Sequence, residues 1–159
     1  MVRERRHRLD SEIYSGERPI SFTLCIKDKR TFFTENPRFK KFEEILLSEL
    51  RNFDCSVYIY LFMPDHMHLT LVGNDSKSNM KKCLEMFKQK TGYWLGKNFP
   101  EIKWQKDYYD HILRKQENLD INIKYILNNP VRAGLVDYWN QYPFKGSTVY
   151  NLDEWSKIW

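Results

Sequence analysis

The segment from Cys55 to Val72 constrains the fold more than any other part of the chain. Cys55–Met63 is rich in aromatic and β-branched residues, which is typical of a central β-strand. Pro64 and Asp65 are turn residues, and His66–Val72 has the pattern of a second strand. The segment therefore predicts an antiparallel β-hairpin.

Apolar periodicity predicts one further strand and three helices around this hairpin. Ile20–Ile26 alternates between apolar and polar side chains, as a half-buried strand does. A helix is predicted to begin at Pro37, a second to span roughly Lys77–Lys97 and a third to span Asn118–Asn128. The third should end before Pro130, because the residue that precedes a proline disfavours helical backbone angles. Trp104–Leu113 is predicted to be either a strand or an irregular segment.

This order of elements predicts an α+β sandwich, with an antiparallel sheet and helices mainly on one face. The 159 residues contain no linker long enough to separate domains, so we expect a single domain over residues 1–159. Apolar residues make up 42% of the chain and aromatic residues 16%, which excludes a disordered protein.

The charge balance is modestly basic. Lys and Arg number 26 against 21 Asp and Glu, giving a net charge of +5, which is compatible with a polyanionic partner. Four of the arginines lie in the first eight residues, where we expect a solvated terminus. Cys25, Cys55 and Cys83 match no zinc or redox spacing, so they are expected to be reduced and buried in a cytoplasmic protein. No apolar run approaches the length of a membrane span, so no membrane association is expected.

His66 and His68 lie two residues apart on the second strand of the hairpin. Because side chains alternate along a strand, both imidazoles should project from one face, about 7 Å apart. Met67 and Leu69 should then face the helices. Two neighbouring imidazoles can clamp a divalent metal. The alternative is two unrelated histidines, one packed and one exposed, but the surrounding alternation places both opposite the core and favours the metal site.

Tyr125 and Asn129 are four residues apart near the end of the last predicted helix, so they should lie on one face, one turn apart. A carboxamide oxygen can bind a hard metal ion, and a phenol beside that ion can act as a nucleophile. The alternative is that Tyr125 is a half-buried helix residue and Asn129 a C-terminal cap.

These motifs together resemble the REP-associated tyrosine transposases. They are the strand motif Pro64–Leu71, the pair Tyr125 and Asn129, and the run Asn129–Val136. That group is a branch of the single-tyrosine HUH transposases, related to those of the smallest insertion sequences. The resemblance extends from about residue 20 to residue 143. It implies a ferredoxin-like fold, similar to an RNA-recognition fold, with a C-terminal helix that carries the tyrosine.

The resemblance also implies roles for individual residues. His66 and His68 would be the HUH metal ligands, Asn129 the third ligand and Tyr125 the nucleophile. Insertion-sequence relatives usually carry Gln where Asn129 stands, whereas the REP-associated branch resembles this chain. The metal would be Mg²⁺ or Mn²⁺, with zinc as an alternative by the chemistry of the ligands. The substrate would be single-stranded DNA with a hairpin. A homodimer and a monomer both remain open, because relatives of both kinds exist.

These roles predict a transposase that cleaves and rejoins single-stranded DNA through a 5′-phosphotyrosine. Two alternatives remain: an inactive nucleic-acid-binding module, and a metal-dependent nuclease in which water attacks. Basic side chains are candidates for contacts to the DNA backbone, namely Arg114, Lys115, Arg132, Lys103 and Lys106. Trp104, Tyr108 and Tyr109 are candidates for base stacking, with core packing as the alternative for each.

Overall fold

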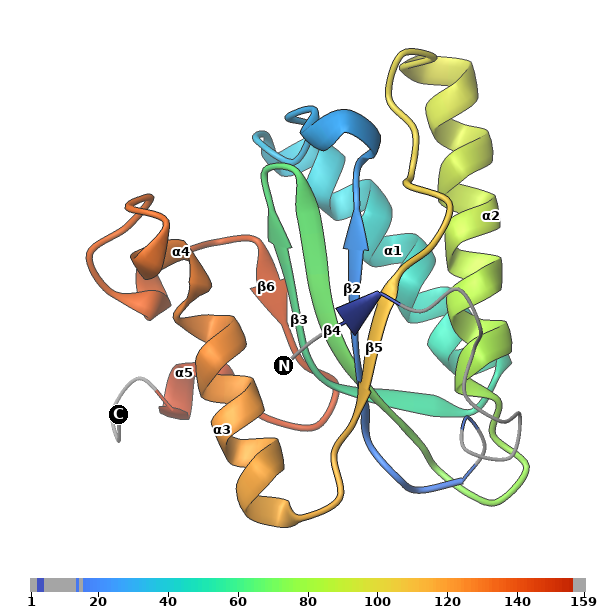
Figure 1. Cartoon of the computed structure of the whole chain (residues 1–159), viewed down its shortest axis with the longest axis vertical. Coiled ribbons are helices and arrows are strands. Elements are labelled where there is room, and N and C mark those ends of the chain that lie inside the picture. Colours follow the sequence, from blue (N-terminus) through green and yellow to red (C-terminus); the bar gives the residue numbers. More distant parts are fainter. Residues whose placement is uncertain (1–2, 5–13, 15, 156–159) are drawn as a thin grey trace.

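A computed structural model describes residues 3–4, 14 and 16–155 (Figure 1). Most of the arginine-rich start of the chain lies outside the described residues. The elements are β1 (Arg3–Glu4), β2 (Ile20–Cys25), η2 (Lys27–Lys29), α1 (Asn36–Asn52), β3 (Cys55–Met63), β4 (His66–Gly73), α2 (Met80–Asn98), β5 (Tyr109–Ile112), α3 (Gln116–Leu127), α4 (Asn129–Arg132), η3 (Trp139–Gln141), β6 (Lys145–Gly146) and α5 (Leu152–Trp155). Among the described residues, no helix combines the length and apolar character needed to cross a lipid bilayer.

The strands form one antiparallel sheet in the order β1-β5-β2-β4-β3-β6. The four central strands and the helices α1 and α2 follow the βαββαβ order of a ferredoxin-like fold, which confirms the predicted fold class. α1 and α2 pack on one face of the sheet, and α3 packs on the other (Figure 1). The sheet is therefore covered on both faces where α3 lies, and this arrangement determines the position of the site.

A β-bulge in β3 allows this strand to contribute buried side chains to both faces of the sheet. The pairing between β3 and β4 shifts between Val57 and Ile59. Before the shift, Val57 belongs to the core under α1 and α2, and after it Tyr60 and Phe62 do. Ile59, Leu61 and Met63 instead contribute to the second core, under α3. This explains why Cys55–Met63 is apolar without alternation: both faces of the strand are buried.

Aromatic side chains fill the core under α1 and α2. The Phe33 ring lies 4.9 Å from the Phe62 ring and 5.0 Å from the Phe42 ring between centroids, both in edge-to-face geometry. Trp104 joins this cluster, and its indole Nε1 donates a hydrogen bond of 2.8 Å to the hydroxyl of Thr91. The aromatic content of the chain is therefore concentrated on the face that does not carry the histidines.

Three predicted elements differ in detail. β2 is buried on both faces rather than half-buried, because α3 covers the face on which Ser21 and Thr23 lie. α2 begins at Met80 instead of near residue 77, since the Asn79 side chain caps it by accepting a hydrogen bond from the backbone N–H of Lys82. In the ambiguous segment 104–113, only Tyr109–Ile112 forms a strand, and Trp104 makes an isolated bridge to Ile26.

The chain bends between α3 and α4. α3 ends at Leu127, before Pro130 as predicted, with Asn128 as its C-cap. Pro130 then lies in the first turn of α4. Backbone N–H groups in a first turn have no partner within the helix, so the N–H that proline lacks costs no hydrogen bond. Asn129 is therefore the first residue of α4 and not, as predicted, part of the helix that carries Tyr125. The prediction missed this bend because the helical pattern continues on either side of Asn128.

The segment after η3 closes the edge of the sheet at β3. The Tyr142 hydroxyl donates a hydrogen bond of 2.5 Å to the carbonyl oxygen of Phe62, and the Phe62 N–H donates one of 2.9 Å to the carbonyl oxygen of Phe144. β6 then pairs with Tyr60 and Leu61. Burial of the Tyr142 phenol raises its pKa above the usual range, so this side chain remains a neutral donor.

The packing of α3 on the sheet can be tested with two isoleucines of this helix. Ile123 is fully buried in the second core, whereas Ile121 is 66% exposed. Ile123→Ala should lower the free energy of unfolding by about 2–5 kcal/mol, because it leaves a cavity. Ile121→Ala should change that free energy by less than about 0.5 kcal/mol. Urea unfolding followed by circular dichroism measures both, and equal effects would show that α3 does not pack as described.

Candidate active site

His66 and His68 lie on β4, on the face of the sheet opposite α1 and α2. β4 pairs with β2 so that His66 is opposite Cys25 and His68 opposite Thr23. The two imidazole centroids are 4.9 Å apart, and the rings are nearly perpendicular, at 89°. Met67 and Leu69 point to the core on the other face. The structure thus brings the two histidines together.

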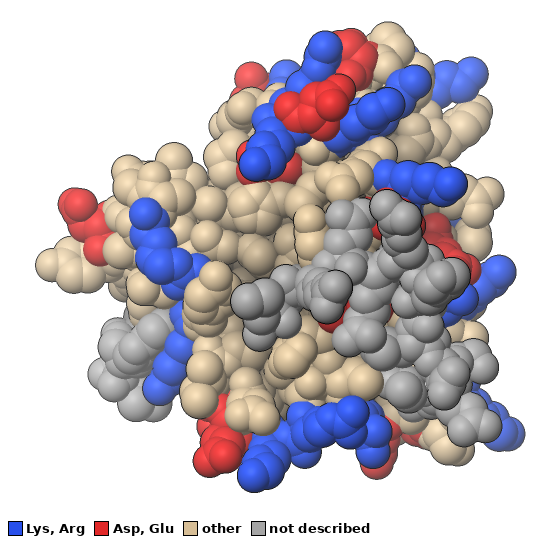
Figure 2. All heavy atoms as spheres, viewed as in Figure 1, with Lys and Arg blue, Asp and Glu red and all other residues tan. Residues whose placement is uncertain are grey.

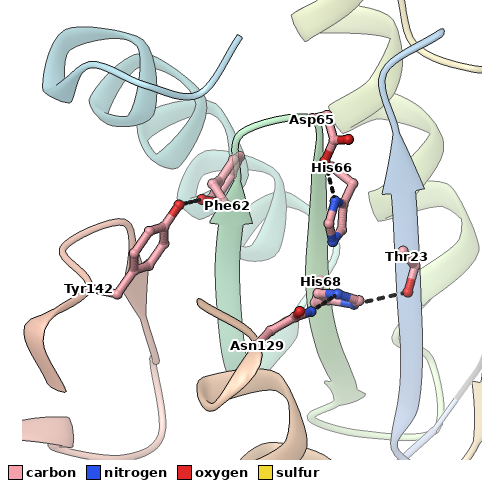
Figure 3. A network of polar contacts seen from close by, with 7 residues as sticks. All are labelled: Thr23, Phe62, Asp65, His66, His68, Asn129 and Tyr142. Carbon is pink, nitrogen blue, oxygen red and sulfur yellow. Dashed lines mark hydrogen bonds and ion pairs between the residues drawn. The ribbon is translucent and has the colours of Figure 1, made fainter. Parts of the chain in front are cut away.

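The His68 ring is held from both sides (Figure 3). It is only 9% exposed. Its Nδ1 lies 3.0 Å from the Thr23 hydroxyl oxygen, and its Nε2 lies 2.6 Å from the Asn129 amide nitrogen. Burial, with smaller contributions from the positive charges of His66 and Arg132, lowers the pKa of His68 to about 3. His68 is therefore neutral at pH 7.

The contacts of His68 define which ring nitrogen carries its proton. An amide nitrogen only donates hydrogen bonds, so Nε2 accepts from Asn129 and must be unprotonated. Nδ1 then carries the proton and donates to the Thr23 hydroxyl.

Asp65 holds the other imidazole. Its carboxylate oxygen lies 2.6 Å from Nδ1 of His66, which leaves Nε2 as the nitrogen without this partner. A carboxylate that accepts from one imidazole nitrogen orients the ring and makes the other nitrogen a better metal ligand. The sequence pointed to Asp65 only as a turn residue and to Thr23 only as a strand residue. Their pairing with the histidines follows from the hairpin geometry and the strand register.

The donor groups fit a divalent metal. The described residues contain no cluster of three or more His, Cys, Asp or Glu side chains suited to a metal, so among them a third ligand would be of another type. The Asn129 carboxamide is such a group, because it already contacts Nε2 of His68 and carries its oxygen on the same planar end. Two imidazoles and one carboxamide oxygen form a mixed nitrogen and oxygen set that suits Mn²⁺ or Zn²⁺ and also accommodates Mg²⁺.

Tyr125 is exposed and lies beside this group. Its side chain is 56% accessible. Tyr125 and His68 line the same hollow, which has a volume of about 670 Å³. The guanidinium carbon of Arg132 lies 3.9 Å from the centroid of the Tyr125 ring, a cation–π contact. The tyrosine is therefore accessible to a ligand, and its ring is positioned by a side chain of the next helix.

The hollow lies between α3 and the strands β5, β2 and β4 of the sheet. Its other lining residues are Thr23, Tyr109, His111, Leu113, Asn118, Ile121 and Asn122. Of these, only Tyr109 was predicted to contact DNA. The sequence pattern gave little indication of the others, because β5 was ambiguous and its pairing with β2 is a tertiary feature.

The predicted DNA contacts divide into two groups. Arg132 adjoins Tyr125, and Arg114 and Lys115 are exposed in the connection that follows Leu113, a residue of the hollow. Lys103 and Lys106 instead line a separate depression beside α2. On the face shown in Figure 2, Lys and Arg side chains are spread around the rim, with many uncharged side chains between them.

Two of the three aromatic candidates for base stacking are core residues. Tyr108 is buried, with its ring 5.7 Å from that of Phe22, and Trp104 packs in the core under α1 and α2. Core packing, the alternative considered for each, is therefore the correct interpretation for these two. Tyr109 lies in the hollow because side chains of β5 alternate between the two faces of the sheet.

Comparison with known proteins gives the family. Residues 18–129 match the family model described as "Transposase IS200 like", a range that contains both histidines, Tyr125 and Asn129. The chain belongs to this family. A REP-associated tyrosine transposase of Escherichia coli K12 is 25% identical over 128 residues, which cover 77% of this chain and 72% of the relative. A Haemophilus influenzae protein, provisionally given the same name, is 20% identical over 135 residues, covering 77% of this chain and 76% of the relative.

Solved structures support the fold of this transposase. A REP-associated tyrosine transposase bound to a REP hairpin superposes with a TM-score of 0.73 and 19% identity, covering 91% of this chain and 82% of the other. At this identity the similarity shows the shared fold. The family and its named relatives are transposases, so membership in the family implies a DNA-cleaving enzyme.

The protonation of His68 can be measured in the metal-free protein. Because its folded pKa is about 3, its imidazole resonances should not move between pH 8 and pH 5 in NMR spectra, where the His68→Gln variant identifies them. Unfolding releases the ring to a pKa of about 6.5. The folded state then binds fewer protons, so stability falls as the pH drops below about 6.5. That loss should be smaller in His68→Gln, whereas a His68 midpoint near pH 6.5 would contradict the burial described.

Proposed function

We propose that this transposase cleaves and rejoins single-stranded DNA through Tyr125, with a divalent metal bound by His66, His68 and Asn129. One observation carries the proposal. An exposed tyrosine lines the same hollow as His68, and the Nε2 atom of His68 contacts Asn129, the first residue of the helix after the one that bears the tyrosine.

The metal would be held by Nε2 of both imidazoles and by the carboxamide oxygen of Asn129. Mg²⁺ or Mn²⁺, if bound there, would supply Lewis-acid polarisation of the scissile phosphate. Asp65 and Thr23 contribute by fixing the two imidazole rings through their Nδ1 atoms. His68 is neutral at pH 7, so the Nε2 lone pair that accepts from the Asn129 amide in this structure would be free to bind a metal once the carboxamide presents its oxygen instead.

Tyr125 would attack the phosphorus atom of the scissile phosphate. A bond forms between its phenolic oxygen and phosphorus as the phenol gives up its proton, the bond from phosphorus to the 3′-oxygen breaks, and the leaving oxygen takes up a proton to become a free 3′-hydroxyl, so that no net proton is gained or lost. The 5′-phosphotyrosine retains a phosphodiester, so a 3′-hydroxyl can reverse the reaction and rejoin DNA without an external energy source. Arg132, stacked on the tyrosine ring, orients the nucleophile and adds positive charge beside the phosphate.

The proposed substrate is DNA that contains a hairpin. The structurally similar REP-associated transposase is described as bound to a REP hairpin, and this supports the same class of ligand here. Arg114 and Lys115, exposed where β5 leads into α3, are suited to contact the DNA backbone near the hollow. All the proposed catalytic residues come from one chain, so both a monomer and a homodimer can carry the reaction.

The nucleophile can be tested with a pool of labelled hairpin oligonucleotides whose loops and flanking single strands are randomised. With Mn²⁺, the wild-type protein should form an adduct that survives a denaturing gel. Tyr125→Phe should reduce that adduct at least 1,000-fold, on the order of the loss that accompanies removal of a covalent nucleophile. Tyr93→Phe, on an exposed tyrosine of α2, should leave the adduct unchanged.

The reaction products distinguish the tyrosine transposase from the two alternative functions, a nuclease that uses water and an inactive DNA-binding module. Cleavage that persists in Tyr125→Phe, with a free 5′-phosphate, would assign the attack to water. Binding without any cleavage by the wild-type protein would indicate an inactive DNA-binding module. An adduct that persists in Tyr125→Phe would refute the assignment of the nucleophile.

Metal binding can be tested separately from activity. His66→Ala and Asn129→Ala should weaken the binding of Mn²⁺ in calorimetry by about 10–100-fold or more, because each removes a proposed ligand. His111→Ala is the matched control, since this histidine lines the hollow but is not among the proposed ligands. A similar loss in all three variants, or in none, would contradict the ligand set.

A further inference from the structure

We infer that the hollow beside Tyr125 binds one unpaired base of the DNA strand, next to the attacked phosphate, and that Asn118 recognises the edge of this base. The inference rests on the proposed function, because Tyr125 defines which phosphate is attacked. It adds a residue that determines which sequence is cleaved.

One face of α3 carries both the tyrosine and two carboxamides. Asn118, Asn122 and Tyr125 are spaced four and three residues apart, so they follow one another along the same face of the helix. All three line the hollow. A base bound against this face would therefore lie within about two helical turns of the nucleophile.

The two carboxamides differ in what they can still bind. The Asn122 oxygen accepts a hydrogen bond of 2.7 Å from Thr70, and its nitrogen donates one of 3.2 Å to the hydroxyl of Ser21. Thr70 and Ser21 are buried in the sheet, so Asn122 fixes α3 against it. Asn118 is exposed, and within the described residues its carboxamide has no side-chain hydrogen bond. Asn118 can therefore donate to and accept from a ligand at the same time.

The opposite wall of the hollow suits the flat face of a base. Tyr109 and His111 lie two residues apart on β5 and both line the hollow, so their rings are on one face of the strand. Leu113 and Ile121 add apolar surface. Ring faces together with one hydrogen-bonding edge are what enzymes use to hold an unpaired base. A phosphate or sugar would gain little from these apolar and aromatic walls.

The size and the chemistry of the hollow reduce the number of bases that it could bind. Its volume of about 670 Å³ lies within the range of small-ligand sites. A carboxamide presents a donor beside an acceptor, the pattern that matches the N6 and N7 atoms of adenine. On the same edge guanine presents two acceptors, N7 and O6, and the pyrimidines have no N7 atom. We therefore expect adenine at this position of the strand.

The experiment sequences both products from the randomised hairpin pool, the DNA joined to the protein and the released strand that ends in the 3′-hydroxyl, so that each base is numbered from the cleaved phosphate. The wild-type products should be enriched in adenine at one position beside the cleavage point. Asn118→Ala should lower that enrichment on the order of tenfold. Asn118→Asp should lower the adenine enrichment as well, since a carboxylate only accepts and cannot donate to N7.

Gln116→Ala is the matched control, because it removes an exposed carboxamide from the same helix outside the hollow. It should keep the adenine enrichment. Adenine enrichment that is unchanged in Asn118→Ala, or lost equally in Gln116→Ala, would overturn the inference. Thermal unfolding of the variants confirms that each is folded.

A binding selection on the same pool with the Tyr125→Phe protein separates this inference from the proposed function. If the wild-type protein forms no adduct but Asn118 still determines the preferred base in bound DNA, the hollow is a base site and the cleavage proposal fails. If adducts form without any base preference that depends on Asn118, the cleavage proposal stands and the assignment of the hollow is wrong.

Discussion

The packing of α3 against the sheet is the interaction on which the site depends. Leu119, Ile123, Ile126 and Leu127 are buried against Ile59, Leu61 and Met63 of β3. The burial of these apolar side chains outweighs the entropy lost when the helix is fixed on the sheet. This contact holds Tyr125 over the face that bears the histidines, and it also brings Asn129, at the start of α4, into contact with His68.

A row of polar side chains lies beside this apolar contact. Ser21 and Thr23 of β2 and His68 and Thr70 of β4 are buried, although each carries hydrogen-bonding groups. A buried polar group is costly unless it is paired. Here Thr23 pairs with His68, and Thr70 and Ser21 pair with Asn122. Through Asn122 the row adds polar contacts between α3 and the sheet, and through Thr23 it fixes the His68 ring.

Burial and hydrogen bonding both favour the neutral form of the His68 ring. The low accessibility disfavours the imidazolium, and the contacts with Thr23 and Asn129 leave Nε2 without a proton. His66 is more accessible and is oriented by Asp65. The two histidines of one strand therefore differ in environment, and in both the Nδ1 atom is engaged by a neighbouring side chain, Asp65 or Thr23.

The sequence determined the local elements and the chemical character of the site. Strands, helices and the shared face of the histidines could be predicted, because side chains alternate along a strand and recur every three to four residues along a helix. The patterns that allowed this were the apolar run Cys55–Met63, the alternation around His66 and His68 and the helical spacing before Pro130. Only the tertiary structure decided that α3 covers β2, that Asn129 begins a new helix and contacts His68, and that Lys103 lies apart from Tyr125. Those outcomes depend on contacts between residues distant in sequence, and local periodicity carries no information about which distant surfaces are complementary.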